Sequence, residues 1–164
     1  MKLLEDTFKN KTVLVTGHTG FKGSWLSAWL NLLGAKVVGC SIDIPSEPSN
    51  FLASKMEEFT EDNRLDIRDI QAVKEVVKNA NPDFIFHLAA QSLVRPSYLN
   101  PLDTLSINAM GSANILESLR ELDKDAVAIM ITSDKAYDNV EWSWGYRETD
   151  KLGGKDPYSA SKGM

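Results

Sequence analysis

Short apolar runs alternate with amphipathic segments along this chain, and the alternation predicts the order of its elements. Runs rich in β-branched and other apolar residues predict strands over residues 12–16, 36–42, 83–88 and 127–132, and a short third strand is expected at 63–66. Helical spacing of apolar residues predicts helices over residues 24–33, 70–79 and 101–122. The intervening segment 43–62 is expected to be mostly loop.

The predicted strands indicate a fold class. They lack the in/out alternation of a sheet with one solvated face, and helices separate most of them in sequence. Such strands form a parallel sheet that helices cover on both faces. Because crossovers between parallel strands are right-handed, we expect an α/β, doubly wound, Rossmann-type fold.

Composition narrows the class of protein. The 164 residues are 43% hydrophobic and 25% charged, which fits one globular domain with a sizeable core. The net charge of −5 and the lack of a basic run give no support for a nucleic-acid partner. The sequence has neither a run of the roughly 18–20 apolar residues of a transmembrane helix nor a signal-peptide core, so we expect no membrane partner and a cytoplasmic location. The single cysteine, Cys40, excludes an internal disulfide and is expected to be a buried strand residue.

Three glycines, Gly17, Gly20 and Gly23, lie between the first predicted strand and the first predicted helix. A glycine-rich turn in this position lets a pyrophosphate approach backbone N–H groups at the positive end of a helix. A P-loop is excluded, because it requires Gly-Lys-Ser/Thr and here Lys22 precedes Gly23. An ordinary tight turn is the alternative, but the strand before it and the helix after it favour a dinucleotide site.

The G-x-x-G-x-x-G spacing of this turn is similar to that of the short-chain dehydrogenase/reductase superfamily, in its extended branch. Further motifs of that family follow in the expected order. Residues 87–90, His-Leu-Ala-Ala, resemble the motif that lies along the cofactor after the fourth strand, and Asn108 resembles the asparagine of the next long helix. Tyr158 and Lys162 match the catalytic Y-x-x-x-K pair. The resemblance runs over nearly the whole chain and implies a Rossmann-type fold that binds a nicotinamide cofactor.

The resemblance also implies which residues contact the cofactor, and it favours NAD over NADP. The family pattern places a ribose-binding residue at Ser41, Asp43 follows two residues later, and no arginine lies nearby to take a 2′-phosphate. Asp66 and Ile67 resemble the family's adenine contact, although a turn or capping role explains Asp66 equally well. The expected cofactor-binding residues are Gly17, Gly20, Phe21, Lys22, Gly23, Ser41, Asp43, Asp66, Ile67, Leu88, Ala89, Ala90, Asn108, Thr132, Tyr158 and Lys162.

Four polar residues at 132–135 end the fifth predicted strand. Ser133 lies where the family has the hydroxyl residue that pairs with the catalytic tyrosine. Nucleotide-sugar 4,6-dehydratases place an acid and a second ionisable residue next, as Asp134 and Lys135 do here. The Ser-Asp-Lys sequence at 133–135, together with residues 141–148, EWSWGYRE, resembles that of the CDP-glucose 4,6-dehydratases.

This resemblance implies a nucleotide-sugar substrate, CDP-glucose, and its NAD-dependent conversion to CDP-4-keto-6-deoxyglucose. Tyr158, supported by the charge of Lys162 and oriented by Ser133, would take the proton of the sugar 4-hydroxyl as C4 is oxidised. Lys135 would remove the proton on C5, and Asp134 would protonate the C6 oxygen so that water leaves. The last two roles need a neutral lysine and a protonated acid, which desolvation favours.

Several alternatives stay open. An isolated Asp-Lys pair is typical of an exposed salt bridge worth about 0–1 kcal/mol, and only its place before the tyrosine motif favours catalysis. Trp142 and Trp144 are either core aromatics or a wall for the sugar nucleotide, and Arg95 and Arg147 are either diphosphate contacts or surface residues. The motifs also suit a dehydratase or 4-epimerase for another nucleotide sugar, or a non-catalytic NAD-binding module.

The chain ends soon after the tyrosine motif, because only Gly163 and Met164 follow Lys162. The family continues through further strands and a C-terminal substrate domain. We therefore expect residues 1–164 to form an incomplete NAD-binding domain, truncated before the last strands, with the substrate domain absent. The resemblance implies a homo-oligomeric full-length enzyme. The chain alone is expected to be inactive and weakly stable, with its fifth strand an open sheet edge.

Overall fold

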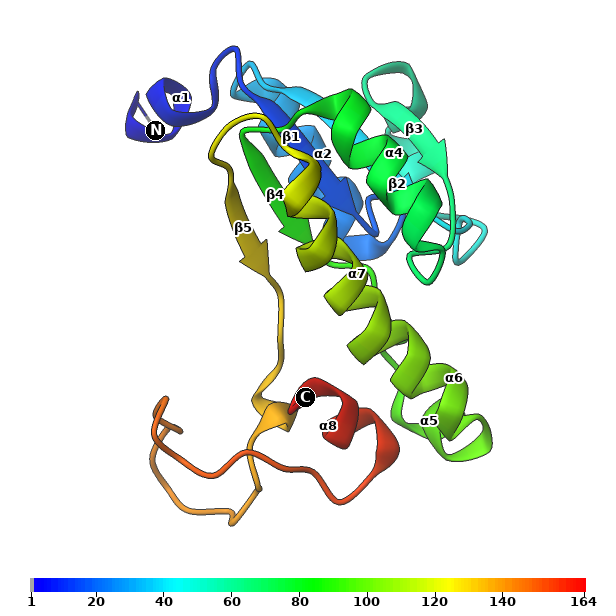
Figure 1. Ribbon diagram of the computed structural model, residues 1–164, viewed down its shortest axis with the longest axis vertical. Coiled ribbons are helices and arrows are strands. Elements are labelled where there is room, and N and C mark those ends of the chain that lie inside the picture. Colours follow the sequence, from blue (N-terminus) through cyan, green and yellow to red (C-terminus); the bar gives the residue numbers. More distant parts are fainter. Residues whose placement is uncertain (1) are drawn as a thin grey trace.

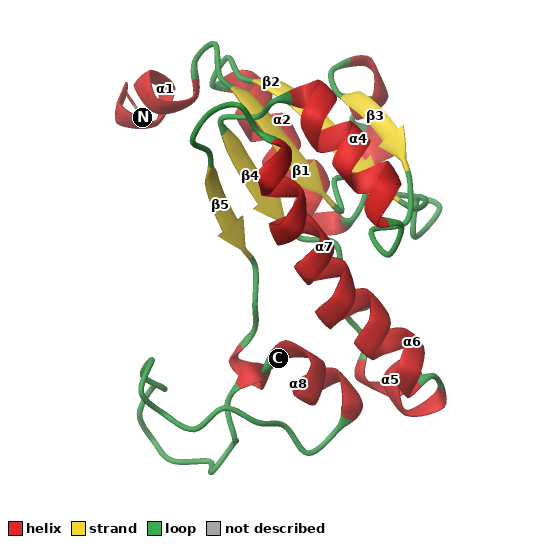
Figure 2. Ribbon diagram, in the orientation of Figure 1, coloured by secondary structure: helices red, strands yellow, loops and turns green. Residues whose placement is uncertain are grey.

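The apolar runs of the sequence pair into one parallel sheet (Figures 1 and 2). Its order is β3-β2-β1-β4-β5, and the order changes direction between β1 and β4, as in doubly wound folds. Every neighbouring pair of strands is parallel, which confirms the expected fold class. In this computed structural model, which describes residues 2–164, the strands are β1 (Thr12–Thr16), β2 (Lys36–Ser41), β3 (Glu61–Arg64), β4 (Phe84–His87) and β5 (Val127–Met130).

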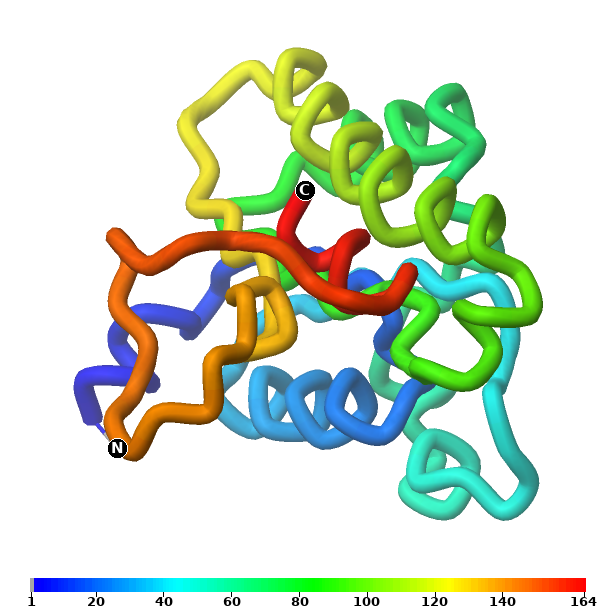
Figure 3. The backbone as a smooth tube through the Cα atoms, turned by 90° about the horizontal axis from the view of Figure 1, so that it is seen from below, coloured from blue at the N-terminus to red at the C-terminus, as the bar shows by residue number. Residues whose placement is uncertain are grey.

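Helices cover both faces of the sheet. Figure 1 shows α4 and α7 in front of the strands and α2 behind them, and the view from below in Figure 3 shows the same two layers. The α-helices are α1 (Lys2–Phe8), α2 (Phe21–Leu32), α3 (Asn50–Ala53), α4 (Ile70–Ala80), α5 (Val94–Leu99), α6 (Pro101–Leu105), α7 (Gly111–Ser118) and α8 (Pro157–Lys162). Short 3-10 turns are η1 (Met56–Glu58), η3 (Leu119–Glu121) and η4 (Asp134–Ala136).

Two hydrophobic clusters, one on each face, hold these layers together. Successive side chains of a strand point to opposite faces, so Leu14 packs with Val73 and Ile115 of α4 and α7, whereas Val13 packs with Leu30 of α2. Cys40 lies in the first cluster, 2% exposed, as predicted. The apolar runs were conspicuous in the sequence because these strands are buried on both sides.

The long helix after β4 contains one irregular turn. The expected helix over residues 101–122 is present, but between α6 and α7 the turn η2 (Ser106–Met110) is a π-helix. The Gly111 N–H donates to the Ser106 carbonyl, five residues earlier, where an α-helix would bond four residues earlier. Such π turns are often found at functional sites.

Several elements differ from the sequence expectation. β3 begins at Glu61, two residues before the predicted position, because its pairing with β2 aligns Glu61 with Val38 and Arg64 with Ser41. α2 begins at Phe21, directly after the second glycine of the turn. The short helices α1 and α5 were not predicted.

Beyond β5 the chain leaves the sheet. Among residues 2–164, β5 pairs with β4 alone and Val127 is 54% exposed, so β5 is an edge strand of this sheet. Figure 2 shows the following segment as mostly loop before it returns to α8, which lies below the strand ends in that view and in front of them in Figure 3. An isolated bridge between Tyr137 and Leu152 closes this loop. Within residues 2–164, no helix combines the length and apolar character needed to cross a bilayer.

Candidate active site

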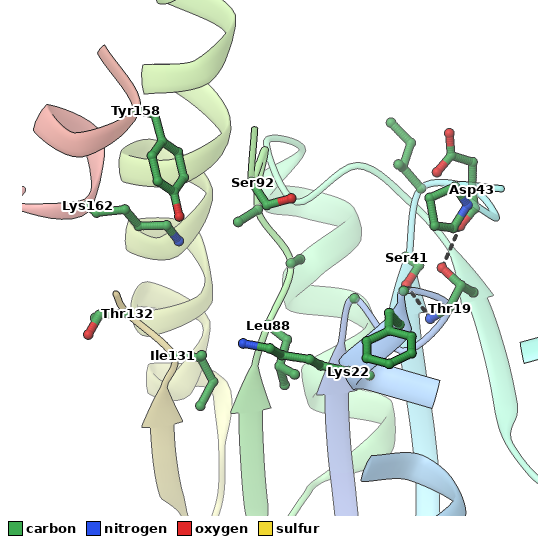
Figure 4. Close-up of a pocket in the computed structure, with 18 residues that line it drawn as sticks. Thr19, Lys22, Ser41, Asp43, Leu88, Ser92, Ile131, Thr132, Tyr158 and Lys162 are labelled. Carbon is green, nitrogen blue, oxygen red and sulfur yellow. Dashed lines mark hydrogen bonds between the residues drawn. The ribbon is translucent and has the colours of Figure 1, made fainter. Parts of the chain in front are cut away.

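A cavity of about 470 Å³ lies at the carboxyl ends of the strands. Ligands of open α/β sheets bind at this edge, near the point where the strand order changes direction. Figure 4 shows side chains converging on it from the glycine turn, from the ends of β2, β4 and β5, and from α8. Its lining residues are Gly17, Thr19, Gly20, Phe21, Lys22, Gly23, Ser41, Ile42, Asp43, Pro45, Leu88, Ala89, Ala90, Ser92, Ile131, Thr132, Tyr158 and Lys162.

The glycine turn permits a close backbone approach. Gly17 has a φ of +73°, and a Cβ there would lie 2.8 Å from the Ala89 nitrogen, so glycine is required. A Cβ on Gly23 would lie 2.0 Å from the Gly17 oxygen, because the helix packs directly on the turn. A Cβ on Gly20 would meet only the Gly17 oxygen, at 3.3 Å, so the missing side chain of Gly20 mainly leaves room on the cavity side.

The first turn of α2 supplies polar groups to this space. Gly20 is the N-cap of the helix, and no side chain caps it. The leading N–H groups of an α-helix have no partner within the helix and carry partial positive charge. Phe21 and Lys22 line the cavity, and the Lys22 side chain extends across it in Figure 4. This set of donors fits a pyrophosphate.

His18, inside the glycine turn, is fully buried and ties the turn to the neighbouring strands. Its Nδ1 lies 2.9 Å from Ser41 Oγ, and its Nε2 lies 3.0 Å from Asp62 Oδ1. Gly39 makes room for the ring, because a Cβ there would lie 2.3 Å from it, and Phe51 packs against it edge-on. Burial lowers the pKa of His18 against the opposing charge of Asp62, so the ring is neutral near pH 7.

Thr16 organises the backbone where β1 and β4 end. Its Oγ1 accepts the N–H groups of Leu88 and Ala89, each at 3.1 Å. The same hydroxyl lies 2.7 Å from Nδ1 of His87. The two residues that follow β4 are thereby fixed against the glycine turn.

His87 links this strand end to the long helix. Ser112 Oγ donates to the Asn108 carbonyl, so it accepts a hydrogen bond from His87 Nε2 at 2.9 Å. This places the proton of the neutral ring on Nε2 and leaves Nδ1 to accept the Thr16 hydroxyl. Burial, and secondarily the charge of Lys162, lower the pKa of His87 to about 4.

Tyr158 and Lys162 lie one helical turn apart on α8 and line the same cavity (Figure 4). The helix is short, but the Asp156 carboxylate caps it by accepting the N–H and hydroxyl of Ser159 at 2.9 and 2.6 Å. Burial acts to raise the pKa of Asp156, but these hydrogen bonds outweigh it and hold the pKa below its usual value. Burial lowers the pKa of Lys162. The tyrosine motif thus meets the glycine turn at one site.

Asn108 lies outside the cavity lining and holds α8 in place. Its Oδ1 accepts the Gln91 N–H at 2.8 Å, while its Nδ2 donates to the Gln91 carbonyl at 2.9 Å and to Ser161 Oγ at 2.8 Å. Ser97 adds a second anchor, because its Oγ accepts the Tyr158 N–H at 3.2 Å. These bonds engage the amide inside the protein, so the geometry gives Asn108 a positioning role, while its expected cofactor contact stays a prediction.

Ser133, Asp134 and Lys135 lie at the η4 turn, outside the cavity lining. Ser133 Oγ donates to Asp134 Oδ1 at 2.9 Å and accepts the Lys135 N–H at 3.2 Å, so it caps its own turn. η4 packs against α8, which brings the three residues beside the tyrosine motif. Both charged side chains are exposed. The desolvation expected to keep the lysine neutral and the acid protonated is therefore not provided by residues 2–164.

A smaller cavity of about 180 Å³ adjoins the first one, and Ser41 and Ala89 are among the residues that line both. Asp66 and Ile67 line the smaller cavity. Asp66 also accepts the Arg68 N–H at 2.9 Å and pairs with the Arg68 guanidinium, which lowers the pKa of Asp66. Asp66 therefore stabilises a turn and also borders a cavity, and its adenine contact stays a prediction.

Several lining residues were not expected from the sequence. Thr19 lines the cavity and donates its hydroxyl to the Asp43 carbonyl at 2.6 Å. It carries no motif of its own, and only its place between two motif glycines would have indicated it. The same holds for the neighbours of other motif residues, namely Ile42, Pro45, Ser92 and Ile131.

The remaining candidates lie away from both cavities. Trp142 and Trp144 stack with ring centroids 5.2 Å apart, and Trp144 is 59% exposed, so they are not core aromatics. Arg95 and Arg147 are exposed and line neither cavity. Within residues 2–164, no three His, Cys, Asp or Glu side chains are placed to hold a metal ion.

The sequence from the first strand onward matches a known family. Residues 14–164 match the family model described as GDP-mannose 4,6 dehydratase. The chain belongs to this family. The match includes the glycine turn, the strand ends and the tyrosine motif, so every wall of the cavity falls within it.

Individual relatives of this GDP-mannose 4,6-dehydratase family member agree with the assignment. The chain is 47% identical over 156 residues to CDP-glucose 4,6-dehydratase of Salmonella typhimurium, covering 95% of the chain and 44% of the relative. Epimerase Mth375 from Methanothermobacter thermautotrophicus has a TM-score of 0.82 at 28% identity, over 97% of this chain and 46% of that one. UDP-glucose 4-epimerase of Thermus thermophilus, in complex with NAD, has a TM-score of 0.79 at 28% identity, over 92% and 47%. The chain spans about half the length of the curated relatives it matches.

Proposed function

We propose that this chain carries the cofactor-binding and catalytic part of an NAD-dependent nucleotide-sugar 4,6-dehydratase that acts on CDP-glucose. The product is CDP-4-keto-6-deoxyglucose, formed with loss of water across C5 and C6. The observation that carries the proposal is a single cavity in which the glycine turn faces Tyr158 and Lys162 across the strand ends. The 47% identity to the Salmonella enzyme supports the choice of CDP-glucose.

NAD fits the groups that line the two cavities. The start of α2, with Lys22, is suited to the pyrophosphate, and Ser41 and Asp43 at the end of β2 are suited to the adenosine ribose. The smaller cavity, bordered by Asp66 and Ile67, is suited to the adenine. When bound, NAD supplies the hydride acceptor for C4 and the hydride donor for C6. The NAD-bound structures of similar proteins support this choice of cofactor.

Proton transfer at the sugar 4-hydroxyl is assigned to Tyr158. The charge of Lys162, one helical turn away, stabilises the phenolate that accepts this proton. Ser133 orients the same hydroxyl by exchanging its hydrogen bond to Asp134 for one to the substrate. The hydrogen bonds from Asn108 and Ser97 hold α8, and with it Tyr158, at the cavity. Small misplacements of a catalytic group reduce rates strongly.

Loss of water is assigned to the exposed pair on η4. Lys135 removes the proton on C5, and Asp134 protonates the C6 oxygen that leaves as water. Because both side chains are exposed in residues 2–164, they need closure over the bound substrate before a neutral lysine and a protonated acid become favourable.

The substrate assignment is tested by assaying the full-length protein with CDP-, dTDP-, UDP- and GDP-glucose. We expect CDP-glucose to give the highest kcat/KM and the 4-keto-6-deoxy product. Inversion at C4 without loss of water would instead identify a 4-epimerase, and NAD binding without turnover would identify a non-catalytic module. Residues 1–164 alone are expected to give no product.

Lys135→Met tests whether oxidation at C4 and loss of water across C5 and C6 depend on different residues. This change is expected to slow exchange of the C5 proton with solvent by about 10²-fold, while hydride transfer from C4 to NAD continues. Lys155→Met is the matched control, because it removes an exposed lysine from the same loop region. Full turnover by Lys135→Met would remove this lysine from the mechanism.

A further inference from the structure

His18 and Asp62 have no part in the proposed reaction, yet they belong to a hydrogen-bonded chain that ends at the cavity. Asp62 Oδ1 lies 3.0 Å from His18 Nε2, and His18 Nδ1 lies 2.9 Å from Ser41 Oγ. His18 is 0% exposed and Ser41 is 5% exposed. Ser41 lines both cavities at the end of β2, where dinucleotide-binding folds usually place a carboxylate for the ribose hydroxyl.

The direction of each proton in this chain follows from the chemistry of its end groups. An ionised carboxylate only accepts hydrogen bonds, so His18 Nε2 carries a proton and donates it to Asp62. The neutral ring then has a bare Nδ1, which accepts the hydroxyl proton of Ser41. The Thr19 N–H approaches the same Ser41 oxygen at 3.4 Å. Ser41 therefore has no proton left for the cavity, and offers it only a lone pair.

We propose that Asp62 and His18 make Ser41 a hydrogen-bond acceptor, and that this acceptor reads the adenosine ribose hydroxyl of the cofactor. The inference rests on the proposed NAD site. A ribose 2′-hydroxyl donates a proton to Ser41 Oγ, whereas an ionised 2′-phosphate presents acceptor oxygens to another acceptor. Ser41 is thus the specificity-determining residue, and His18 and Asp62 are its positioning residues.

The protonation of His18 reverses this arrangement. The charged groups that act on its ring are Asp62 and Arg64, both on β3, and the Cys40 carbonyl lies on its β2 side. Burial lowers the pKa of His18 more than Asp62 raises it, so the pKa lies below 6.5. Protonation adds a proton to Nδ1, which then donates to Ser41 Oγ, and the Ser41 hydroxyl proton turns towards the cavity. Acid therefore converts Ser41 from an acceptor into a donor.

The test uses calorimetric dissociation constants of the full-length protein for NAD, 2′-deoxy-NAD and NADP, from about pH 8 down to about pH 5. Wild-type protein should prefer NAD to both analogues at the higher pH, and its preference over NADP should fall as His18 becomes protonated, because Ser41 then donates to the 2′-phosphate, whereas a ribose hydroxyl can either donate or accept. Ser41→Ala should reduce that preference about three- to tenfold, the effect of one hydrogen bond, and abolish its pH dependence.

The hydrogen-bonded series Asp62–His18–Ser41 is called the relay below. Asp62→Asn tests the relay without removing the buried His18 ring. It keeps an acceptor for His18 Nε2 but removes the charge that raises the pKa of His18, so the midpoint of the pH profile should move to lower pH. A purely structural role would not move this midpoint. Glu61→Gln is the matched control, because it removes a carboxylate from the same strand whose partner is Lys36, 3.0 Å away. Its midpoint should stay unchanged.

The outcomes separate this inference from the proposed function. If wild-type protein bound no NAD, both would be wrong. If it bound NAD with a preference that Ser41→Ala left intact, the relay would be wrong and the cofactor site would stand. An unchanged midpoint in Asp62→Asn would equally overturn the role of the relay.

Discussion

The two walls of the cavity are held by different means. The glycine-turn wall, residues 12–24 with β2, is fixed by backbone packing and by buried polar side chains such as Thr16 and His18. The α8 wall, residues 133–162, is attached to the long helix and α5 through Asn108 and Ser97. The proposed cofactor site is thus part of the sheet core, while the proposed proton-transfer groups lie on an attached element.

The packing of the α8 wall supports this contrast. Its buried residues are Ala136, Ser159 and Ser161, and none of them belongs to either hydrophobic cluster. Short side chains bury little apolar area, so capping and hydrogen bonds contribute most of the stability of α8. Cofactor binding and catalysis should therefore respond to different mutations.

Tyr158→Phe should separate the walls most completely. It removes only the phenolic hydroxyl, so turnover should fall by about 10⁴-fold, the upper range for a proton-transfer group. NAD affinity should change far less, because the glycine-turn wall is untouched. Product formation and calorimetry on the same preparation check both values. A comparable loss of NAD affinity would show that the walls act as one unit.

Gly20→Val is the converse change. A valine side chain would occupy the cavity in front of the α2 N–H groups, and loss of two charge-assisted hydrogen bonds should weaken NAD binding by about 10³-fold. The unfolding temperature should change little, because a Cβ at Gly20 meets only one atom at 3.3 Å. Gly23→Val is the contrast, since its Cβ would lie 2.0 Å from the Gly17 oxygen and should destabilise the fold. Unchanged NAD affinity in Gly20→Val would contradict the cofactor site.

Acid should destabilise the folded protein through His87, which bonds Thr16 of the glycine-turn wall. Its pKa is about 4 in the folded protein against 6.5 for an unperturbed histidine, so the unfolded state binds more protons as pH falls below 6.5. Stability from this residue is complete above pH 6.5 and is lost progressively down to about pH 4, by about 3 kcal/mol in total. Urea unfolding as a function of pH measures this loss. His87→Gln should flatten part of the dependence, with His18 supplying the rest, and an undiminished slope would exclude His87 as the cause.

Asn108→Ala should have the smallest effect of the four changes. It removes the side chain that bonds the Gln91 N–H and carbonyl, and the bond that Ser161 Oγ accepts, while Ser161 still donates to the Tyr158 carbonyl. α8 loosens, so kcat should fall by about tenfold through misplacement of Tyr158. Asn114→Ala is the matched control on the same helix, because its amide instead supports the carbonyls of Ile67 and Arg68. Equal losses of kcat in the two variants would show that anchoring of α8 is not the cause.

The sheet was predictable because its central strands are buried on both faces. Residues 12–16 coincide with β1, whose apolar run faces two helix layers. The predicted position of β3 (Glu61–Arg64) was two residues too late. A polar edge strand carries no hydrophobic signal, and only its pairing with β2 defines its position. In the site, the motifs predicted the residues that line the cavity, but not the residues that hold this lining in place. The bond between His18 and Asp62 joins residues 44 positions apart, and no local pattern encodes such a contact.

The π turn of the long helix changes the direction in which the side chains beyond it point. An α-helix turns by about 100° per residue, so one extra residue in a turn rotates everything beyond it by about that angle relative to a regular continuation. Within the π turn, Asn108 reaches α8; after it, Gly111 lies against Ile67 and Ile115 enters the core. A regular helix would point one of these two faces away from its target. Deleting a single residue from the turn would therefore force the helix to serve either the sheet or the catalytic element.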